Sequence, residues 1–444
     1  MTAQKFITNP GPDTIPRTAD VLVIGGGPAG TAALWAVERL APGTRTVLIE
    51  KSDRLGAGST LASLENYRSC WPALCLARQM QRSIDVFHQA DEYLGEGASL
   101  SIALKQRGYL FCAFNEAQAA VYQADVRRLH GIGLTHIEYL DADEVAYRFG
   151  WVGRNVIAAK YDPVAGWLDS NALIYRYAQS APSARILLGI PEVLIQTSGG
   201  RVKGVRTPNG DIAAPVVVIA AGAGSGLVAR SAGVKLPVVL RPRQSFTTIW
   251  RHDPFPEDSP MIIGAPPYPH VRPEAQTGAI FGWEYNWHNK YAAPEHGTND
   301  HRDAIIDPVY PVETLKDSRF PSVTLALLAR QFQHRNNEGF SDPRYLRGIS
   351  HNIGYYVYRD ASVAYRTTAE GDHQAYDSER AIIDAWPGIE GLFVSTAHVG
   401  HGIMSSPAAG EILACKILGQ PLSDPSFAAF GLDVPWVEYD EGVL

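Results

Sequence analysis

The sequence predicts an α/β protein with a Rossmann-like domain, into which a mostly antiparallel β-sheet domain is inserted. Three observations predict this fold. The N-terminus reads as strand, glycine turn, helix and strand, and apolar runs typical of buried parallel strands recur far along the chain. The third observation is a middle region of short alternating runs rich in proline and aromatic residues. The 444 residues allow two or three domains.

The N-terminal unit has the length and order of a βαβ motif. Residues 19–24 form an apolar run that ends in glycines, residues 28–40 read as a helix rich in Ala and Leu, and residues 45–50 form a second strand. The first 18 residues contain Pro10, Pro12 and Pro16 and no apolar core, so we expect an irregular leader and not a signal peptide.

Later strands are expected to return to the same sheet. Residues 214–222 resemble a parallel strand that is buried on both faces, and residues 391–396 precede a helix over about 407–418. The predicted domains are therefore discontinuous. Residues 17–100, 160–230 and 386–444 form the cofactor domain, and residues 101–159 and 231–385 form the substrate domain.

The glycine turn predicts a dinucleotide site. Gly25, Gly27 and Gly30 form a G-x-G-x-x-G between strand and helix, where free N–H groups and the helix dipole face a pyrophosphate. Glu50 ends the second strand, where its carboxylate can accept both ribose hydroxyls and would repel a 2′-phosphate. This unit alone does not separate FAD from NAD.

The bulk composition excludes several classes of protein. The formal net charge is −7 without a dense Lys/Arg run, which disfavours nucleic acid and anionic membrane partners. No window approaches a membrane span, and no Cys/His cluster has metal spacing. The four cysteines form no CxxC pair, so we expect a reduced, cytoplasmic protein.

Short segments along the rest of the chain occur in a characteristic order. They lie at 56–68, 108–111, 140–145, 166–169, 199–205, 218–223, 272–274 and 400–411. From Ala19 to Gly419, their number and order resemble the D-amino-acid oxidase, glycine oxidase and sarcosine oxidase superfamily of flavoproteins. The resemblance implies FAD as the cofactor and an oxidoreductase acting on a small molecule.

The resemblance also implies a set of site residues. The residues expected to contact FAD are Gly25, Gly27, Pro28, Ala29, Gly30, Glu50, Lys51, Gly58, Ser59, Thr60, Val193, Ala221, Gly222, Gly400, His401, Gly402, Ile403 and Met404. The segment 400–402 and the helix after it would point at the pyrimidine edge of the flavin, where a helix N-terminus stabilises negative charge. We expect the backbone of His401 to matter more than its imidazole. For catalysis we expect Tyr365 to contact substrate, Arg366 to bind a carboxylate and Arg68 to lie near the flavin.

Three positions depart from the patterns of the superfamily. Val363 stands where sarcosine oxidases carry a cysteine bound to FAD, so we expect non-covalent FAD. Met404 stands at the place of their carboxylate-binding lysine, and the strand 279–283 lacks their oxygen-activating lysine. Glycine oxidase has an arginine near the Tyr365 position, and Arg366 lies one residue off that register.

These features lead to a functional hypothesis with two alternatives. We expect oxidation of the C–N bond of an amine or amino-acid derivative by hydride transfer to flavin N5, giving an imine that hydrolyses, with O₂ or another molecule as final acceptor. The aromatic middle region favours a substrate bulkier than glycine or sarcosine. The first alternative is oxidation of a C–O bond in a 2-hydroxyacid or alcohol, which needs a base such as His398 or His373. The second is a flavin-binding protein without catalytic activity.

Overall fold

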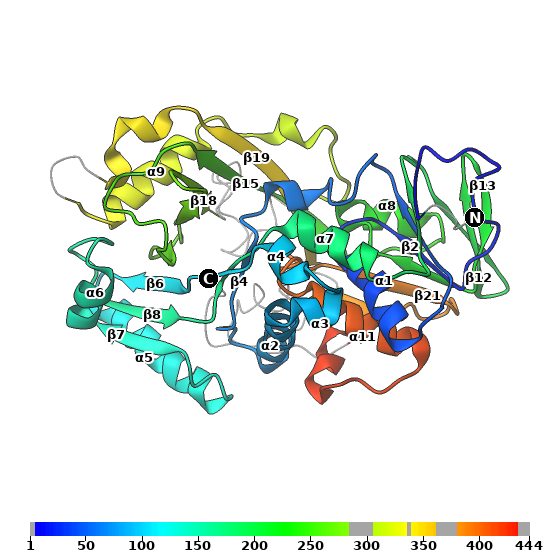
Figure 1. Ribbon diagram of the computed structural model, residues 1–444, viewed down its shortest axis with the longest axis horizontal. Helices are drawn as coiled ribbons and strands as arrows, with labels where there is room; N and C mark the ends of the chain where they lie inside the picture. Colours follow the sequence, from blue (N-terminus) through cyan, green and yellow to red (C-terminus); the bar gives the residue numbers. More distant parts are fainter. Residues whose placement is uncertain (1–4, 284–304, 335–338, 361–379, 434–444) are drawn as a thin grey trace, which may run out of the picture.

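The computed structural model describes residues 5–283, 305–334, 339–360 and 380–433. Two large β-sheets with their covering helices form two parts that lie side by side in Figure 1. The predicted fold class, a mixed α/β protein with several sheets, is confirmed.

The first sheet has seven strands in the order β1-β10-β3-β2-β14-β21-β20. All neighbouring strands are parallel except β20 and β21, which are antiparallel. Their bounds are β1 Phe6–Thr8, β10 Arg185–Leu188, β3 Thr46–Glu50, β2 Val21–Ile24, β14 Val216–Ile219, β21 Leu392–Thr396 and β20 Ile382–Ala385.

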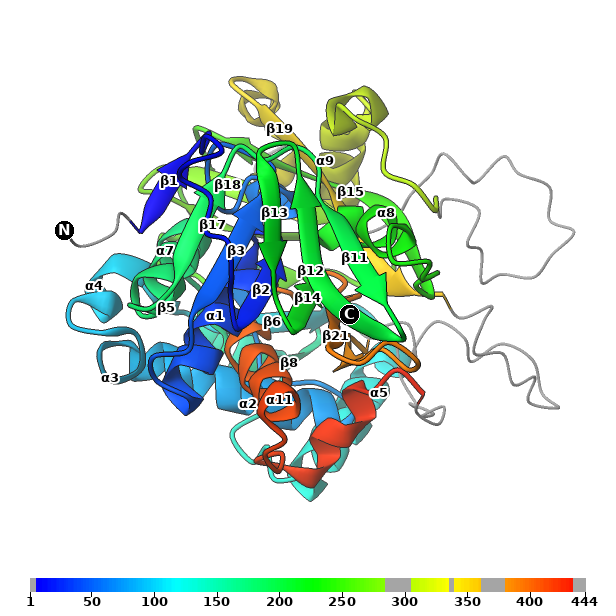
Figure 2. The same cartoon turned by 90° about the vertical axis from the view of Figure 1, so that its right-hand side faces the viewer.

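The two faces of this sheet bury alternate residues of each strand. Val21 and Val23 face a core built with helices α1 (Pro28–Leu40), α2 (Leu74–His88), α7 (Ser170–Gln179) and α11 (Ser406–Leu418). Leu22 and Ile24 face the other core, which the sheet of β11 (Leu194–Ser198), β12 (Arg201–Thr207) and β13 (Gly210–Ala213) covers, as Figure 2 shows. A Cβ on Gly410 of α11 would lie 2.5 Å from the Ala32 carbonyl oxygen of α1, so the two helices are in close backbone contact.

The second sheet has eight strands in the order β19-β15-β18-β17-β16-β6-β8-β7. Every pair is antiparallel except β16 with β6. Their bounds are β19 Ser350–Arg359, β15 Val238–Thr248, β18 Gly278–Trp283, β17 His270–Glu274, β16 Met261–Ile263, β6 Tyr109–Ala113, β8 Ala158–Asp162 and β7 Glu138–Asp141.

Aromatic side chains of this sheet pack mainly against each other and against helix α9 (Phe320–Gln331). Phe246 stacks on Phe281 with ring centroids 4.6 Å apart, and Phe320 contacts Phe246 edge-on. The remaining helices and short strands are α3 Ala90–Leu94, α4 Ala98–Ile102, α5 Glu116–Gly131, α6 Ala142–Phe149, α8 Ser225–Arg230, β4 Asn66–Tyr67, β5 Lys105–Gln106 and β9 Gly166–Trp167. The 3₁₀ helices are η1 Ser59–Ala62, η2 Gly222–Gly224, η5 Val312–Leu315, η6 Gly339–Ser341, η7 Pro343–Leu346 and η8 Pro425–Phe430.

The strands and helices predicted around the first sheet are present, with three differences. The helix over 28–40 has the predicted bounds, and the helix near 407–418 begins one residue earlier, at Ser406. The expectation of an irregular leader is wrong, because Phe6–Thr8 pairs with β10 at the edge of the sheet. Strand β20 lies before residue 386, so the first sheet reaches back into the range assigned to the substrate domain.

Within the described ranges, no helix combines the length and the apolar character that crossing a membrane requires.

Candidate active site

One cavity of about 880 Å³ lies between the two sheets. Its walls come from the glycine turn after β2, the ends of β3, β14 and β21, helix η1, and the facing strands β15, β17, β18 and β19. The carboxyl ends of parallel strands therefore open into it, as is usual for ligand sites of α/β sheets.

The glycine turn is shaped by close contacts on two sides and open space on the third. A Cβ on Gly25 (φ +115°) would lie 2.3 Å from the Ala220 carbonyl oxygen, and one on Gly30 would lie 2.0 Å from the Gly25 carbonyl oxygen. Apart from its chain neighbours and its own helix, a Cβ on Gly27 would meet no atom of the described residues within 4 Å. Gly27 is the N-cap of α1 and lines the cavity, so the unpaired N–H groups of the first helical turn face this open side.

Glu50 closes the same end of the cavity. Its Oε2 accepts a hydrogen bond from the Gly26 N–H at 2.7 Å, and its Oε1 accepts one from the Ser52 N–H at 2.9 Å. Each carboxylate oxygen keeps a second acceptor site. The neighbouring Lys51 places its Nζ 3.9 Å from the ring centroid of Tyr310, which also lines the cavity.

Ser59 joins η1 to the second sheet. Its hydroxyl donates to the Tyr355 carbonyl oxygen at 2.8 Å and accepts from the Tyr355 N–H at 3.0 Å. A Cβ on Gly354 would lie 3.1 Å from the Ser59 Cα, so only a small residue fits there. The cavity wall is thus continuous from the glycine turn, through η1, to strand β19.

The segment after β21 also lines the cavity. The His398 Nε2 lies 3.1 Å from the Ser395 Oγ, and burial lowers the pKa of this imidazole to about 3, with a smaller contribution from His401. A Cβ on Gly400 would lie 2.6 Å from the ring of Tyr356. Gly400 therefore lets the loop pass close to strand β19.

The chain matches the family model described as FAD dependent oxidoreductase, DAO, over residues 20–416. It belongs to this family. The FAD-dependent oxidoreductase is 24% identical over 475 residues to FAD-dependent oxidoreductase domain-containing protein 1 homolog of Drosophila melanogaster, covering 96% of this chain and 81% of that protein. It is 26% identical over 300 residues to sarcosine oxidase subunit beta of Rhizobium meliloti, covering 63% of this chain and 67% of that protein.

A solved structure supports the fold of the oxidoreductase. L-proline dehydrogenase from P. horikoshii superimposes with a TM-score of 0.69 at 20% identity, covering 94% of this chain and 98% of that one.

The groups that line the cavity of the oxidoreductase match the chemistry of FAD. The space beside Gly27 that a Cβ would fill is open, and the two oxygens of Glu50 retain acceptor sites at the same end. Elsewhere in the lining, the His398 Nδ1 is buried and has no hydrogen-bond partner among the described residues. A long ligand with a phosphate group at one end and polar ring atoms at the other matches these groups.

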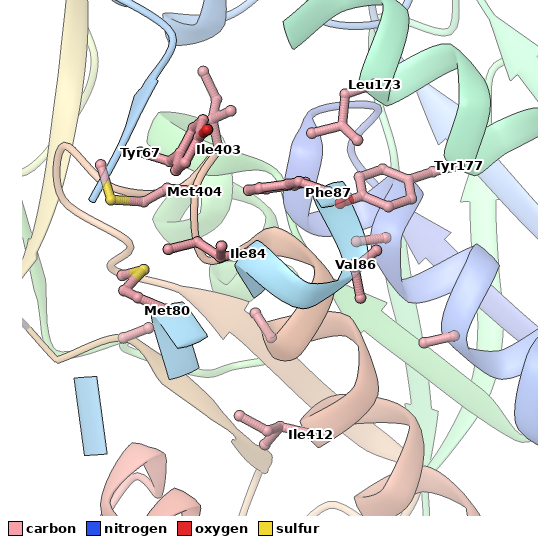
Figure 3. Close-up of a cluster of buried hydrophobic side chains, with 14 of the residues drawn as sticks. Tyr67, Met80, Ile84, Val86, Phe87, Leu173, Tyr177, Ile403, Met404 and Ile412 are labelled. Atoms are coloured by element: carbon pink, nitrogen blue, oxygen red, sulfur yellow. The ribbon is translucent and has the colours of Figure 1, made fainter. Parts of the chain in front are cut away.

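The predicted cofactor contacts divide into two sets. Most of them line the cavity: Gly25, Gly27, Pro28, Ala29, Glu50, Lys51, Gly58, Ser59, Thr60, Val193, Ala221, Gly222, Gly400, Gly402 and Ile403. The other three, Gly30, His401 and Met404, are not among its lining residues. Gly30 instead permits the close packing of the turn, and His401 contacts Trp71 edge-on with ring centroids 4.9 Å apart. Met404 lies in the apolar cluster with Tyr67 and Ile84 in Figure 3.

The predicted catalytic residues are only partly described. Tyr365 and Arg366 lie outside the described residues, as do Val363 and His373. Arg68 is buried, with its guanidinium 4.1 Å from the ring of Trp71 and 5.5 Å from that of Phe111, and it is not among the lining residues. Its charge nevertheless acts on the neighbouring imidazole of His270, which does line the cavity.

Sequence reasoning did not single out the polar residues that the second sheet contributes. Arg243, His270 and Asn352 line the cavity from strands β15, β17 and β19. They occur in no short motif, because strand pairing over long sequence distances brings them together. The one local signal was the segment 272–274, which begins two residues after His270.

Proposed function

We propose that this FAD-dependent oxidoreductase oxidises the C–N bond of an amine or amino-acid derivative, with FAD bound non-covalently. The observation that carries the proposal is the cavity that joins the glycine turn of the first sheet to the polar residues of the second. When bound, FAD supplies the acceptor for the hydride that leaves the carbon next to nitrogen, and the resulting imine hydrolyses.

We propose that the cofactor lies along the lining residues of the first sheet. The N–H groups at the start of α1 face the pyrophosphate, with Gly27 allowing its close approach. Glu50 accepts the ribose hydroxyls while its backbone hydrogen bonds hold its orientation. Gly400, Gly402 and Ile403 border the flavin ring.

The two imidazoles that line the cavity from the described residues favour C–N over C–O oxidation. Burial lowers the pKa of His398 to about 3 and that of His270 to about 4. In C–O oxidation the hydroxyl group must give up its proton as the hydride leaves the carbon that bears it, and an effective base has a pKa near the working pH. An amine that enters the site neutral needs no such base. The names of the similar proteins, a sarcosine oxidase subunit and an L-proline dehydrogenase, agree with an amine substrate.

We propose that the remaining predicted residues act on the substrate side. Tyr365 contacts the substrate, Arg366 binds its carboxylate, and Arg68 contributes positive charge near the flavin. The aromatic and polar strands of the second sheet give room for a substrate bulkier than glycine.

The cysteines support a non-covalent cofactor and a cytoplasmic location. All four, Cys70, Cys75, Cys112 and Cys415, are buried free thiols, and none is a lining residue of the cavity. No thiol is therefore placed to form a thioether with the flavin. Buried free thiols are also typical of a reducing compartment.

The test is reduction of the purified, FAD-loaded protein under anaerobic conditions. Candidate amines and amino acids should bleach the yellow absorbance, and 2-hydroxyacids of the same carbon skeleton should not. Acid precipitation should release the FAD into the supernatant. Bleaching by hydroxyacids alone would show that the substrate bond is C–O, and flavin retained in the precipitate would refute non-covalent binding.

A further inference from the structure

A single row of residues crosses the second sheet on the side that faces η1. Asn352 pairs with Ser245, Ser245 with Gly282, and Gly282 with His270. The Ser245 hydroxyl donates to the Ala62 carbonyl oxygen of η1 at 2.8 Å, so the Ser245 side chain points to the face of the sheet that lies against η1. Because paired residues point to the same side of a sheet, the side chains of Asn352 and His270 share this face.

Gly282 has no side chain, and the imidazole of His270 occupies the space that one would fill. A Cβ on Gly282 would lie 2.2 Å from the His270 Nε2. The imidazole therefore leans across the neighbouring strand, with Nε2 in the space that any other side chain would fill. Gly282 and His270 both line the cavity, so Nε2 lies at its wall.

The hydrogen bond at the other ring nitrogen fixes the tautomer. The His270 Nδ1 lies 3.0 Å from the Tyr268 carbonyl oxygen, which can only accept, so Nδ1 carries the proton. Burial lowers the pKa of the ring to about 4, and the positive charge of Arg68 acts in the same direction. At neutral pH the ring is uncharged, and its Nε2 is an acceptor only.

We propose that His270 determines specificity in the reaction proposed above, by accepting at Nε2 a hydrogen bond from an N–H of the substrate amine. The inference rests on the proposed function and adds the class of nitrogen that the site selects. Neutral primary and secondary amines carry an N–H and satisfy Nε2. A neutral tertiary amine has no N–H and would leave a buried acceptor without a partner.

Two planar carboxylates test this recognition without turnover. Pyrrole-2-carboxylate presents a ring N–H, and furan-2-carboxylate presents a ring oxygen in the same place. Calorimetric titration of the FAD-loaded protein should give a preference of about tenfold for the pyrrole, which is the ratio expected for one hydrogen bond between uncharged groups.

Three variants assign the preference to His270. His270→Leu should reduce it to about one, and His270→Gln should keep part of it, because the side-chain oxygen of Gln can accept at a similar distance. His252→Leu is the matched control. His252 is also buried, bonds the Tyr345 hydroxyl through Nδ1 at 2.6 Å, and is not a cavity residue, so this variant should keep the full preference.

The outcomes separate this inference from the proposed function. Equal binding of the two probes by the wild type, no binding of either, or a preference that persists in His270→Leu would overturn the role of His270. If the preference is present and lost in His270→Leu, but no amine bleaches the flavin, then the acceptor role stands and the proposed C–N oxidation fails.

Discussion

Replacing Glu50 by Gln perturbs the proposed ribose site with almost no change in side-chain shape. The carboxylate accepts from the Gly26 N–H at 2.7 Å and from the Ser52 N–H at 2.9 Å. In Gln the amide NH₂ must face one of these donors, so one backbone hydrogen bond is lost. The ribose also loses a charged acceptor, which costs on the order of 1.5–3 kcal/mol of binding free energy. FAD affinity should therefore fall about 10- to 150-fold.

Titration of the apoprotein with FAD, followed by quenching of flavin fluorescence, measures this change. Glu313→Gln is the control, because Glu313 also lines the cavity but is exposed to solvent. It should bind FAD as the wild type does, and turnover of the FAD-loaded Glu50→Gln protein should change less than its affinity. Equal FAD affinity in Glu50→Gln and wild type would refute the assignment of Glu50 to the ribose.

Three further predictions follow from the same geometry. Gly27→Ala should fold normally and lose FAD affinity. Gly30→Ala should instead lower the thermal midpoint of the apoprotein, because its Cβ would lie 2.0 Å from the Gly25 carbonyl oxygen. Equal thermal midpoints for the two variants would contradict this. The apoprotein should lose stability as the pH falls from 6.5 to about 4, because in this range the unfolded chain binds protons that the buried histidines of the folded protein do not. For His270 alone the loss in free energy of unfolding is on the order of 3 kcal/mol. A free energy of urea unfolding that stays constant over this range would be inconsistent with neutral imidazoles at His252, His270 and His398. Reoxidation of the reduced flavin by O₂ in rapid mixing should be slow, because β18 carries no lysine to supply positive charge, and slower still in Arg68→Ala. Fast reoxidation in both proteins would show that positive charge at these positions does not control the rate.

The N-terminal unit could be predicted almost to the residue because its signals are local. Pro28 at the first helical position and the glycines before it set the start of α1, and the apolar run ending at Glu50 sets β3. Strand β1 was missed because Phe6–Thr8 is short and followed by prolines, and only its pairing with β10 makes it a strand.

The cavity wall formed by the second sheet could not be predicted, because it depends on strand register. His270 and Gly282 are neighbours only through the pairing of β17 with β18, and Asn352 joins them through β15. For Arg68, the sequence identified the residue but not all of its contacts. Its position in a motif was recognisable, but its contact with Phe111 depends on strand β6, which no local pattern connects to it.

The most direct test of the account is the fate of the substrate nitrogen in a single anaerobic turnover. The FAD-loaded protein is mixed with an excess of an amine that bleaches it, and the released ammonia or amine and the carbonyl product are counted against the FAD reduced. Oxidation of a C–N bond followed by imine hydrolysis predicts one nitrogen product and one carbonyl product for each FAD. Complete bleaching with the C–N bond of the substrate intact would contradict the account.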